Sequence, residues 1–310
     1  MYTAAVPGRD PAPPTPVGRA VDARLLAVSG AAFISLTAVF IRLADVTPAS
    51  AVFYRCLLAL PPLAVLAALE WRRTQGVPRR TVLRFVVAGA LLGVDFALWS
   101  QAILLIGAGI STVLVNVQVV VVPLLSFLII GTRIPARFVL CVPVLFAGIA
   151  LAGGFAGGVE AGADLYWGTF LALLSGLAYA GYIFIVGGSG SSRNVAVQVL
   201  LSTAAAGFVG SAVGLSWGPI DLTPGWPAFG WLVALALSAQ VFGWILLGGS
   251  LPRLAPEVGA TLLLLQPVLA MVAAVLVVGE RPAPLQLLGC VLVVGAAWFV
   301  SRAPSVVGTA

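Results

Sequence analysis

The chain has 310 residues, of which 61% are hydrophobic and 8% are charged; its mean hydropathy is +1.13 and its formal net charge is +6. Soluble domains carry about 25% charged residues, so this composition leaves too little polar surface to face water. A soluble domain is therefore excluded, and the sequence predicts an integral membrane protein.

The composition also excludes several kinds of site. The sequence contains no histidine, which removes histidine metal ligands and histidine proton relays. Cys56, Cys141 and Cys290 each lie within an apolar run, which is typical of small buried hydrophobes rather than of disulfides or metal ligands. We expect neither a metal nor a cofactor.

The first 24 residues differ from the rest of the chain. The stretch "PGRDPAPPTPVGRA" is polar, rich in proline and too short to fold, and it is not the basic start of a cleaved signal peptide. Residues 1–24 are therefore predicted to form a disordered cytoplasmic tail, which an uncleaved first membrane helix follows.

From residue 25 onward, apolar runs alternate with turn-forming segments. About 20 apolar residues in a helix cross a hydrocarbon core of roughly 30 Å, and a helix satisfies its own backbone hydrogen bonds. The fold class predicted is all-α and polytopic, with ten transmembrane helices at about 25–43, 49–69, 83–105, 110–130, 137–155, 165–187, 195–216, 228–249, 257–278 and 285–302. The break at Gly107 to Gly109 is the shortest and carries no charge.

The arginines indicate how the helices are oriented. With the N-terminus inside, thirteen of the sixteen arginines fall in the inner segments, Arg281 alone falls outside, and Arg42 and Arg55 lie within apolar runs. Cytoplasmic loops carry an excess of positive charge. Both termini are therefore predicted to be cytoplasmic, in a multi-pass protein of the inner membrane. The bilayer and a small-molecule substrate are the expected partners, nucleic acid is not, and monomer and homodimer stay open.

Two stretches of the chain are alike. Residues 113–140 read "VLVNVQVVVVPLLSFLIIGTRIPARFVL", and residues 261–288 read "TLLLLQPVLAMVAAVLVVGERPAPLQLL". Identical pairs include Gln118 and Gln266, Gly131 and Gly279, and Arg133 and Arg281, and Ser29-Gly30 gives a fainter match to Ser175-Gly176. The chain is thus predicted to contain two five-helix repeats, 25–155 and 165–302. Because five is odd, the second is inverted, as is common in secondary transporters.

Three of these stretches resemble a known family. "QPVLAMVAAVLVVGERPAPLQLLGCVLVVGAAWFV", "FYRCLLAL" and "VNVQVVVVPLLSFLIIGTRIP" are similar to segments of the EamA type of the drug/metabolite transporter superfamily. Thr132 stands where that family usually has Glu, and Val119 where it often has Pro. The resemblance implies ten helices, an inverted repeat and movement of small metabolites, commonly export of amino acids or related compounds.

One acid lies deep in an apolar run. Asp95, in "LLGVDFALW", is roughly 15 Å from the outer end of its predicted helix, and Arg55 is roughly 9 Å deep in the preceding one. Two interpretations are open: a structural ion pair, or a carboxylate that exchanges protons or binds a substrate amine. Trp99 follows Asp95 at i+4 and either stacks on a substrate or packs beside Arg55.

Two amides occupy equivalent places in the repeats. Gln118 and Gln266 each need a hydrogen-bond partner, in a neighbouring helix or in a wet cavity. Pro267 frees the carbonyl of Leu263, which favours a kinked helix at the repeat interface. A binding site and simple helix-to-helix contact are both open. Further candidates for the cavity lining are Tyr179, Tyr182, Gln240 and Trp244.

Two charged pairs are interpreted as rim features. Glu280 and Arg281 in "GERP" are expected in a tight, solvated turn, and Arg42 is expected to pair with Asp45.

No histidine, cysteine cluster, Gly-Lys-Thr phosphate loop or close carboxylate pair supports catalysis, so no enzyme is expected. The leading hypothesis is a secondary transporter that exports small metabolites by alternating access, with protons as a candidate coupling ion. The alternatives are an intramembrane lipid-modifying enzyme and a non-transporting scaffold.

Overall fold

The computed structural model describes residues 22–72, 76–131, 136–153, 162–187, 194–254 and 256–301. Within these ranges the chain is built from helices and contains no β-strand. The all-α prediction is therefore confirmed for the described part of the chain. Of the predicted N-terminal tail, residues 1–21 lie outside the described residues.

The first half forms five helical segments, and two of them are interrupted. In chain order they are α1 (Ala23–Ser35) with α2 (Thr37–Ala44), α3 (Pro48–Trp71), α4 (Arg79–Ile106), α5 (Ala108–Leu114) with the 3₁₀ turn η1 (Val115–Val117) and α6 (Gln118–Ile130), and α7 (Ala136–Ala152).

The second half also forms five segments. They are α8 (Ala163–Gly187), α9 (Val195–Gly214) with the 3₁₀ turn η2 (Leu215–Trp217), α10 (Ala228–Leu235) with the π-helix η3 (Ala236–Gly243) and α11 (Trp244–Ser250), α12 (Pro256–Leu263) with α13 (Leu265–Ala273) and the π-helix η5 (Ala274–Val278), and α14 (Pro284–Ser301). The 3₁₀ turn η4 (Leu251–Arg253) follows α11.

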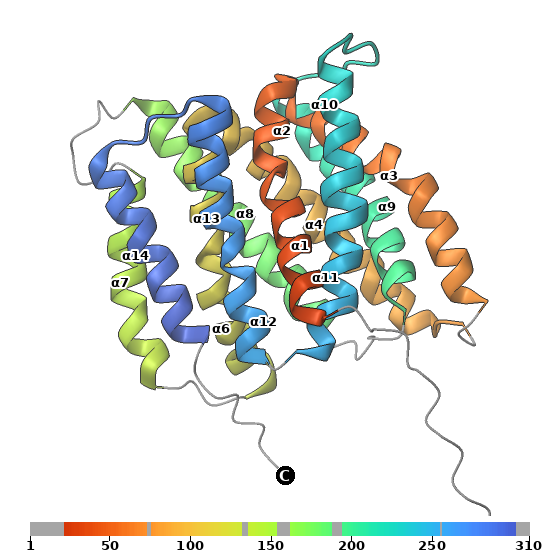
Figure 1. The fold of residues 1–310 in the computed structure, drawn as a ribbon, viewed down its shortest axis with the longest axis horizontal. Coiled ribbons are helices and arrows are strands. Elements are labelled where there is room, and N and C mark those ends of the chain that lie inside the picture. Colours follow the sequence, from red (N-terminus) through yellow and green to blue (C-terminus); the bar gives the residue numbers. More distant parts are fainter. Residues whose placement is uncertain are drawn as a thin grey trace, which may run out of the picture.

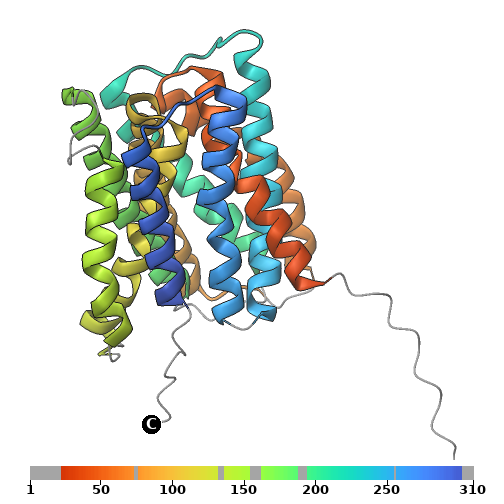
Figure 2. The ribbon, with the colours of Figure 1, turned by 60° about the vertical axis from the view of Figure 1, so that its left-hand side comes forward.

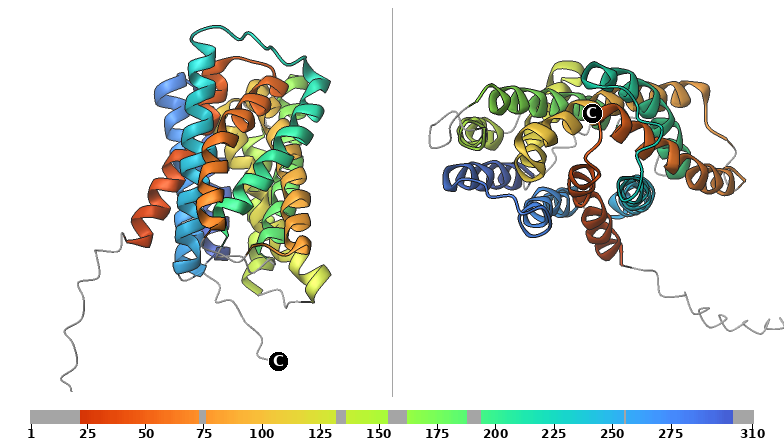
Figure 3. Two further views of the ribbon diagram at one scale, coloured as in Figure 1. Left: turned by 90° about the vertical axis from the view of Figure 1, so that its right-hand side faces the viewer. Right: turned by 90° about the horizontal axis from the view of Figure 1, so that it is seen from above.

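The two halves enter the bundle from opposite faces. α1 begins and α14 ends at one face, named here the terminal face (Figures 1 and 2). α8 begins at the opposite face, because Gly162 and Asp164 line one pocket together with Gly107 at the start of α5. The helices run side by side between the two faces (Figure 3). Five segments and opposite entry give the two halves inverted orientations.

Seven helical segments are long and apolar enough to cross a membrane. They are Ala23–Ala44, Pro48–Trp71, Arg79–Ile106, Ala108–Ile130, Ala163–Gly187, Val195–Trp217 and Ala228–Ser250. Three shorter apolar helices complete the described set: Phe138–Ala152, Leu265–Val278 and Pro284–Phe299. The ten segments follow the predicted crossings in order. That all ten cross the bilayer stays a prediction.

The outside of the bundle is apolar. Leu128, Ile129, Leu140 and Phe208 are exposed, at 67%, 65%, 69% and 81% of their surface. Large contiguous apolar patches are rare on soluble proteins, whereas lipid-facing helices require them. The exposed surface therefore fits a bilayer, as the composition predicts.

Glycine brings α4 and α9 into close contact. A Cβ atom added to Gly93 would lie 2.6 Å from the carbonyl oxygen of Ala206, and one added to Gly210 would lie 2.5 Å from the carbonyl oxygen of Gly93. Small residues at such an interface let two helix backbones approach, which supplies van der Waals contact that lipid cannot replace. This seam joins the first half to the second.

A capping threonine and two glycines shape several of the helix ends. Thr47 caps α3, its hydroxyl accepting a hydrogen bond from the Ser50 amide at 3.2 Å, and Pro48 occupies the first turn. Gly131 and Gly279, at the ends of α6 and η5, both have left-handed φ angles of 78° and 76°. Their equivalence matches the sequence repeat, because only glycine adopts this conformation at little cost.

The structure corrects both predictions about rim charges. Glu280 is half-buried rather than solvated: its Oε1 and Oε2 accept hydrogen bonds from the backbone amides of Ala108 and Gly109, at 2.5 and 3.0 Å. It thereby caps α5 in the other half of the chain, since a helix N-terminus carries free amides. Arg42 donates to the carbonyl oxygen of Leu104 at 3.3 Å instead of pairing with Asp45.

Candidate functional site

An internal cavity of about 60 Å³ lies where the irregular helical segments of both halves meet. Ser35, at the break between α1 and α2, Asn116 in η1 and Gln266 beside the α12–α13 break all line it. Interrupted helices expose backbone groups, and in transporters they are found where they line a cavity. The remaining lining residues are Ile34, Arg55, Asp95, Phe96, Trp99, Thr112, Val115, Gln118, Tyr179, Trp244 and Pro267.

Arg55 supplies the positive charge of the cavity. It lies in α3 with only 3% of its surface exposed, and its Nε donates to Oε1 of Gln240 at 2.9 Å. Its guanidinium carbon is 3.6 Å from the centroid of the Phe96 ring, a cation–π contact. Its Nη1 has no hydrogen-bond partner. One nitrogen is therefore positioned by the protein, while another is left without a partner at the cavity.

Gln240, which does not line the cavity, positions Arg55 by a hydrogen bond. It lies in the π-helix η3 with 1% exposure, and its Nε2 donates to the hydroxyl of Thr203 on α9 at 2.7 Å. Because both ends of the amide are engaged, its orientation is determined and its oxygen faces Arg55. π-helical segments occur mostly as local insertions and are frequent at functional sites. The chain Arg55–Gln240–Thr203 connects α3, η3 and α9.

Asp95 supplies the negative charge. It lies in α4 with 5% exposure, and its Oδ1 accepts a hydrogen bond from the hydroxyl of Ser175 on α8 at 2.5 Å. Arg55 and Asp95 therefore take different hydrogen-bond partners, and the described residues form no ion pair between them within 4 Å. The cavity holds two opposite charges that do not neutralise each other by direct contact.

Several polar atoms of the lining have no partner. They are Nη1 of Arg55, Nε1 of Trp99, Nε1 of Trp244 and Oε1 of Gln118. Buried polar groups in proteins are almost always hydrogen-bonded, because leaving one unpaired costs roughly 1–3 kcal/mol. Three donors and one acceptor converge on one cavity. This set fits a ligand that has hydrogen-bond-accepting oxygens and at least one donor.

Aromatic rings separate this cavity from a larger one. Tyr179 and Trp244 line both the central cavity and a second cavity of about 530 Å³. Tyr182 stacks on Tyr179 with ring centroids 5.9 Å apart and meets Trp244 edge-on at 5.5 Å. Gly187 and Leu251, at helix ends on the terminal face, line the larger cavity. A vestibule therefore extends from the aromatic cluster toward the terminal face.

Hydrogen bonds join the two halves at the opposite face. The Asp221 amide donates to the Ser50 hydroxyl at 2.8 Å, and the Thr47 hydroxyl donates to the carbonyl oxygen of Pro219 at 2.8 Å. The Glu280 carboxylate adds its two hydrogen bonds to the start of α5. The vestibule thus lies on the terminal side of the cavity, and these contacts between the halves lie at the opposite face.

The structure brings most of the predicted site residues together. Seven of them line the central cavity: Arg55, Asp95, Trp99, Gln118, Tyr179, Trp244 and Gln266. Tyr182 lines the vestibule and Gln240 lies behind Arg55. Ser175, Thr203 and Phe96 were missed. Only Ser175 had a signal in the sequence, since it belongs to the Ser-Gly pair that echoes the first repeat.

Comparison with known protein families shows which family this chain belongs to. The model of the EamA-like transporter family matches it twice, over residues 23–154 and 166–302. The chain belongs to the EamA-like transporter family. The two matches confirm the resemblance inferred from the sequence, and each covers one of the two halves seen in the structure.

A solved structure shares the fold of this EamA-like transporter. It is described as "Crystal structure of protein", superposes with a TM-score of 0.61 at 18% sequence identity, and the alignment covers 89% of this chain and 95% of that one. No curated protein matches the chain. The family membership makes this EamA-like chain a multi-pass membrane transporter, and the irregular segments of its two repeats meet at the cavity.

Proposed function

We propose that this protein is a secondary transporter that exports small metabolites bearing both a carboxylate and an amine, such as amino acids or related compounds, across the cytoplasmic membrane by alternating access. One observation carries the proposal: a cavity between the two halves is lined by Arg55, which has an unpartnered nitrogen, and separately by the Asp95 carboxylate. A charged group inside the membrane is costly to place and indicates function.

The two charges fit the two ends of one substrate. A carboxylate accepts charge-assisted hydrogen bonds from a guanidinium, and Nη1 of Arg55 is free to donate one. An ammonium group donates to a carboxylate, and Asp95 accepts only the Ser175 hydroxyl among the described residues. The unpartnered indole donors of Trp99 and Trp244 provide further contacts for carboxylate oxygens.

In this conformation the cavity is too small for the substrate. A volume of about 60 Å³ holds a few water molecules. Binding must therefore widen the site, and the aromatic cluster of Tyr179, Tyr182 and Trp244 is the barrier that stands between it and the vestibule. Substrate from the cytoplasm enters past these rings, and release on the other side requires that the Glu280 and Asp221 contacts break.

Asp95 is the group through which protons would couple to transport. Its carboxylate faces the cavity, so its charge changes what the cavity attracts. When it is charged it favours an amine-bearing substrate, and when it is neutral it does not. Proton binding and substrate binding at Asp95 therefore compete, which is the condition for exchange of one against the other.

The test is transport by the purified protein in liposomes. Counterflow of labelled amino acids, amines and carboxylic acids should show saturable movement of compounds that carry both groups, and weaker movement of those that carry one. An imposed pH gradient should change the rate. Liposomes with the Arg42→Gln variant serve as the matched control, because Arg42 lies outside the cavity lining. Absence of saturable flux across this panel would refute the proposal.

A further inference from the structure

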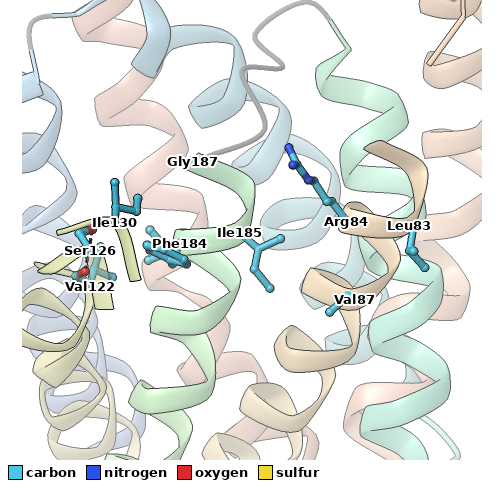
Figure 4. A pocket seen from close by; sticks show the side chains of 10 residues that line it. Leu83, Arg84, Val87, Val122, Ser126, Ile130, Phe184, Ile185 and Gly187 are labelled. Carbon is cyan, nitrogen blue, oxygen red and sulfur yellow. Dashed lines mark hydrogen bonds between the residues drawn. The ribbon is translucent and has the colours of Figure 1, made fainter. Parts of the chain in front are cut away.

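A second concavity lies on the outside of the bundle. It is a groove of about 720 Å³ between α4, α6 and α8, near the terminal face (Figure 4). Its walls are apolar: Val87 comes from α4, Val122 and Ile130 from α6, and Phe184 from α8. The hydroxyl of Ser126 donates to the carbonyl oxygen of Val122 at 3.0 Å, so its proton is already engaged. The walls offer apolar contact rather than free hydrogen-bond donors.

Among the described residues that line the groove, Arg84 alone is charged. Its side chain is exposed, and Figure 4 shows it extending from α4 toward α8. Among the described residues it has neither an ion-pair partner nor a hydrogen-bond acceptor. The groove therefore combines an apolar channel with a cation that has no partner among the described residues.

The cation lies at the interfacial end of the groove. α4 begins at Arg79 and Arg80, both exposed at the terminal face, and Arg84 follows one turn further along the helix. Gly187, at the end of α8, lines the same end of the groove. The positive-inside distribution assigns this face to the cytoplasm. That leaflet carries anionic lipids, and basic pockets between transmembrane helices bind their head groups.

We propose that this groove binds one anionic phospholipid, with its phosphate on Arg84 and an acyl chain along the walls formed by Val87, Val122 and Phe184. Charge complementarity selects this occupant. A zwitterionic lipid would fill the walls equally well but would bring no net charge to Arg84. A second copy of this apolar surface would cover the walls and leave Arg84 unpaired. The proposal does not depend on the transport proposal, because the groove and the central cavity share no lining residue.

The test measures lipid binding to the delipidated full chain in detergent. Dioleoylphosphatidylglycerol should raise the thermal unfolding midpoint more than dioleoylphosphatidylcholine, and native mass spectrometry should show one retained phosphatidylglycerol per chain. Arg84→Gln should weaken phosphatidylglycerol binding by about fivefold, equivalent to about 1 kcal/mol for one interfacial cation. Arg84→Lys should retain most of the binding because it keeps the charge.

Two further variants make the test specific. Arg253→Gln removes another exposed cation at the terminal face that does not line the groove, and it should bind phosphatidylglycerol as the unmodified protein does. Val87→Trp fills the groove and should also weaken binding. Equal stabilisation by both lipids, an equal loss in Arg253→Gln, or a dimer that Val87→Trp dissociates without any lipid preference would each overturn the proposal.

Discussion

At the residue scale, the position of Arg55 depends on Gln240. Gln240→Leu removes the acceptor for Nε of Arg55 and the donor to Thr203. A buried charge then loses its partner, and hydrogen bonds to charged groups are worth about 1.5–3 kcal/mol. We expect a lower thermal midpoint and at least tenfold weaker substrate binding, measured by unfolding in detergent and by isothermal titration.

The Gln240→Glu variant distinguishes the effect of the charge of Arg55 on substrate binding from the effect of its position. A carboxylate at this place keeps an acceptor for Nε but pairs with the guanidinium, so the positive charge of Arg55 is neutralised. The variant should fold and yet lose affinity for carboxylate-bearing substrates. If its affinity matched that of the unmodified protein, Arg55 would not be the anion-binding group.

Asp95 offers a second test at this scale. Asp95→Asn keeps an oxygen that can accept from Ser175 at the same place and removes only the charge. The variant should fold normally, and its flux in liposomes should no longer respond to an imposed pH gradient. Ser175→Ala is the control, since it removes the hydrogen bond and leaves the carboxylate. A pH response that survives in Asp95→Asn would assign coupling elsewhere.

Single residues show where reasoning from sequence ends. The isolation of Asp95 and Arg55 in apolar runs singled out two residues that both line the central cavity. Their actual partners, Ser175 and Gln240, are 80 and 185 residues away along the chain. A local pattern carries no information about which side chains face each other across helices. The sequence left open whether Arg55 and Asp95 pair directly, and in the structure each takes a different hydrogen-bond partner.

At the element scale, the seam between α4 and α9 depends on glycine. Gly93→Ala places a Cβ 2.6 Å from the carbonyl oxygen of Ala206, so the helices must separate. Overpacking of this kind costs about 1–3 kcal/mol. We expect a lower thermal midpoint than for Gly249→Ala, where an added Cβ meets nothing within 4 Å. Equal midpoints would show that the seam adapts.

Glu280 forms a second contact between elements, and its contribution to stability can be tested. Glu280→Gln keeps one oxygen as an acceptor but removes the charge that faces the amides of Ala108 and Gly109. Loss of a carboxylate at a helix N-terminus costs about 0.3–2 kcal/mol. The thermal midpoint should fall, whereas Arg281→Gln, at the neighbouring exposed residue, should leave it unchanged. An equal fall in both variants would point to a general effect of the turn.

The elements were largely predictable, and their irregularities were not. Hydropathy and turn residues predicted the position of every described helical segment. They also predicted the short, uncharged break at Gly107 to Gly109, where Gly107 has a φ angle of 89°. Pro267 indicated the α12–α13 break. The break at Leu36 and the π-helix η3 contain no proline, so no local sequence signal indicated them. These irregular segments are the ones that border the cavity or hold Arg55.

At the scale of the whole molecule, the two faces are unequal in this conformation. The vestibule reaches the terminal face, and hydrogen bonds join the two halves at the opposite face. Under the proposed alternating access, the reverse state would arise if each half adopted the conformation of the other, as in transporters with inverted repeats. The proposal then requires that the Glu280 and Asp221 contacts open when the aromatic cluster closes.

Thiol labelling tests directly whether the protein alternates between these two states. In a background with Cys56, Cys141 and Cys290 replaced by alanine, Ile110→Cys places a thiol at a buried position near the closed face, and Val195→Cys places one in the vestibule. Substrate should increase the labelling rate at position 110 and decrease the labelling rate at position 195. The reason is that bound substrate shifts the protein from the state open at the terminal face toward the state open at the opposite face. A parallel rise at both sites would indicate loosening of the bundle rather than alternation. Membrane-impermeant reagent added from outside whole cells should reach only position 110, which tests the predicted orientation of the chain in the same experiment.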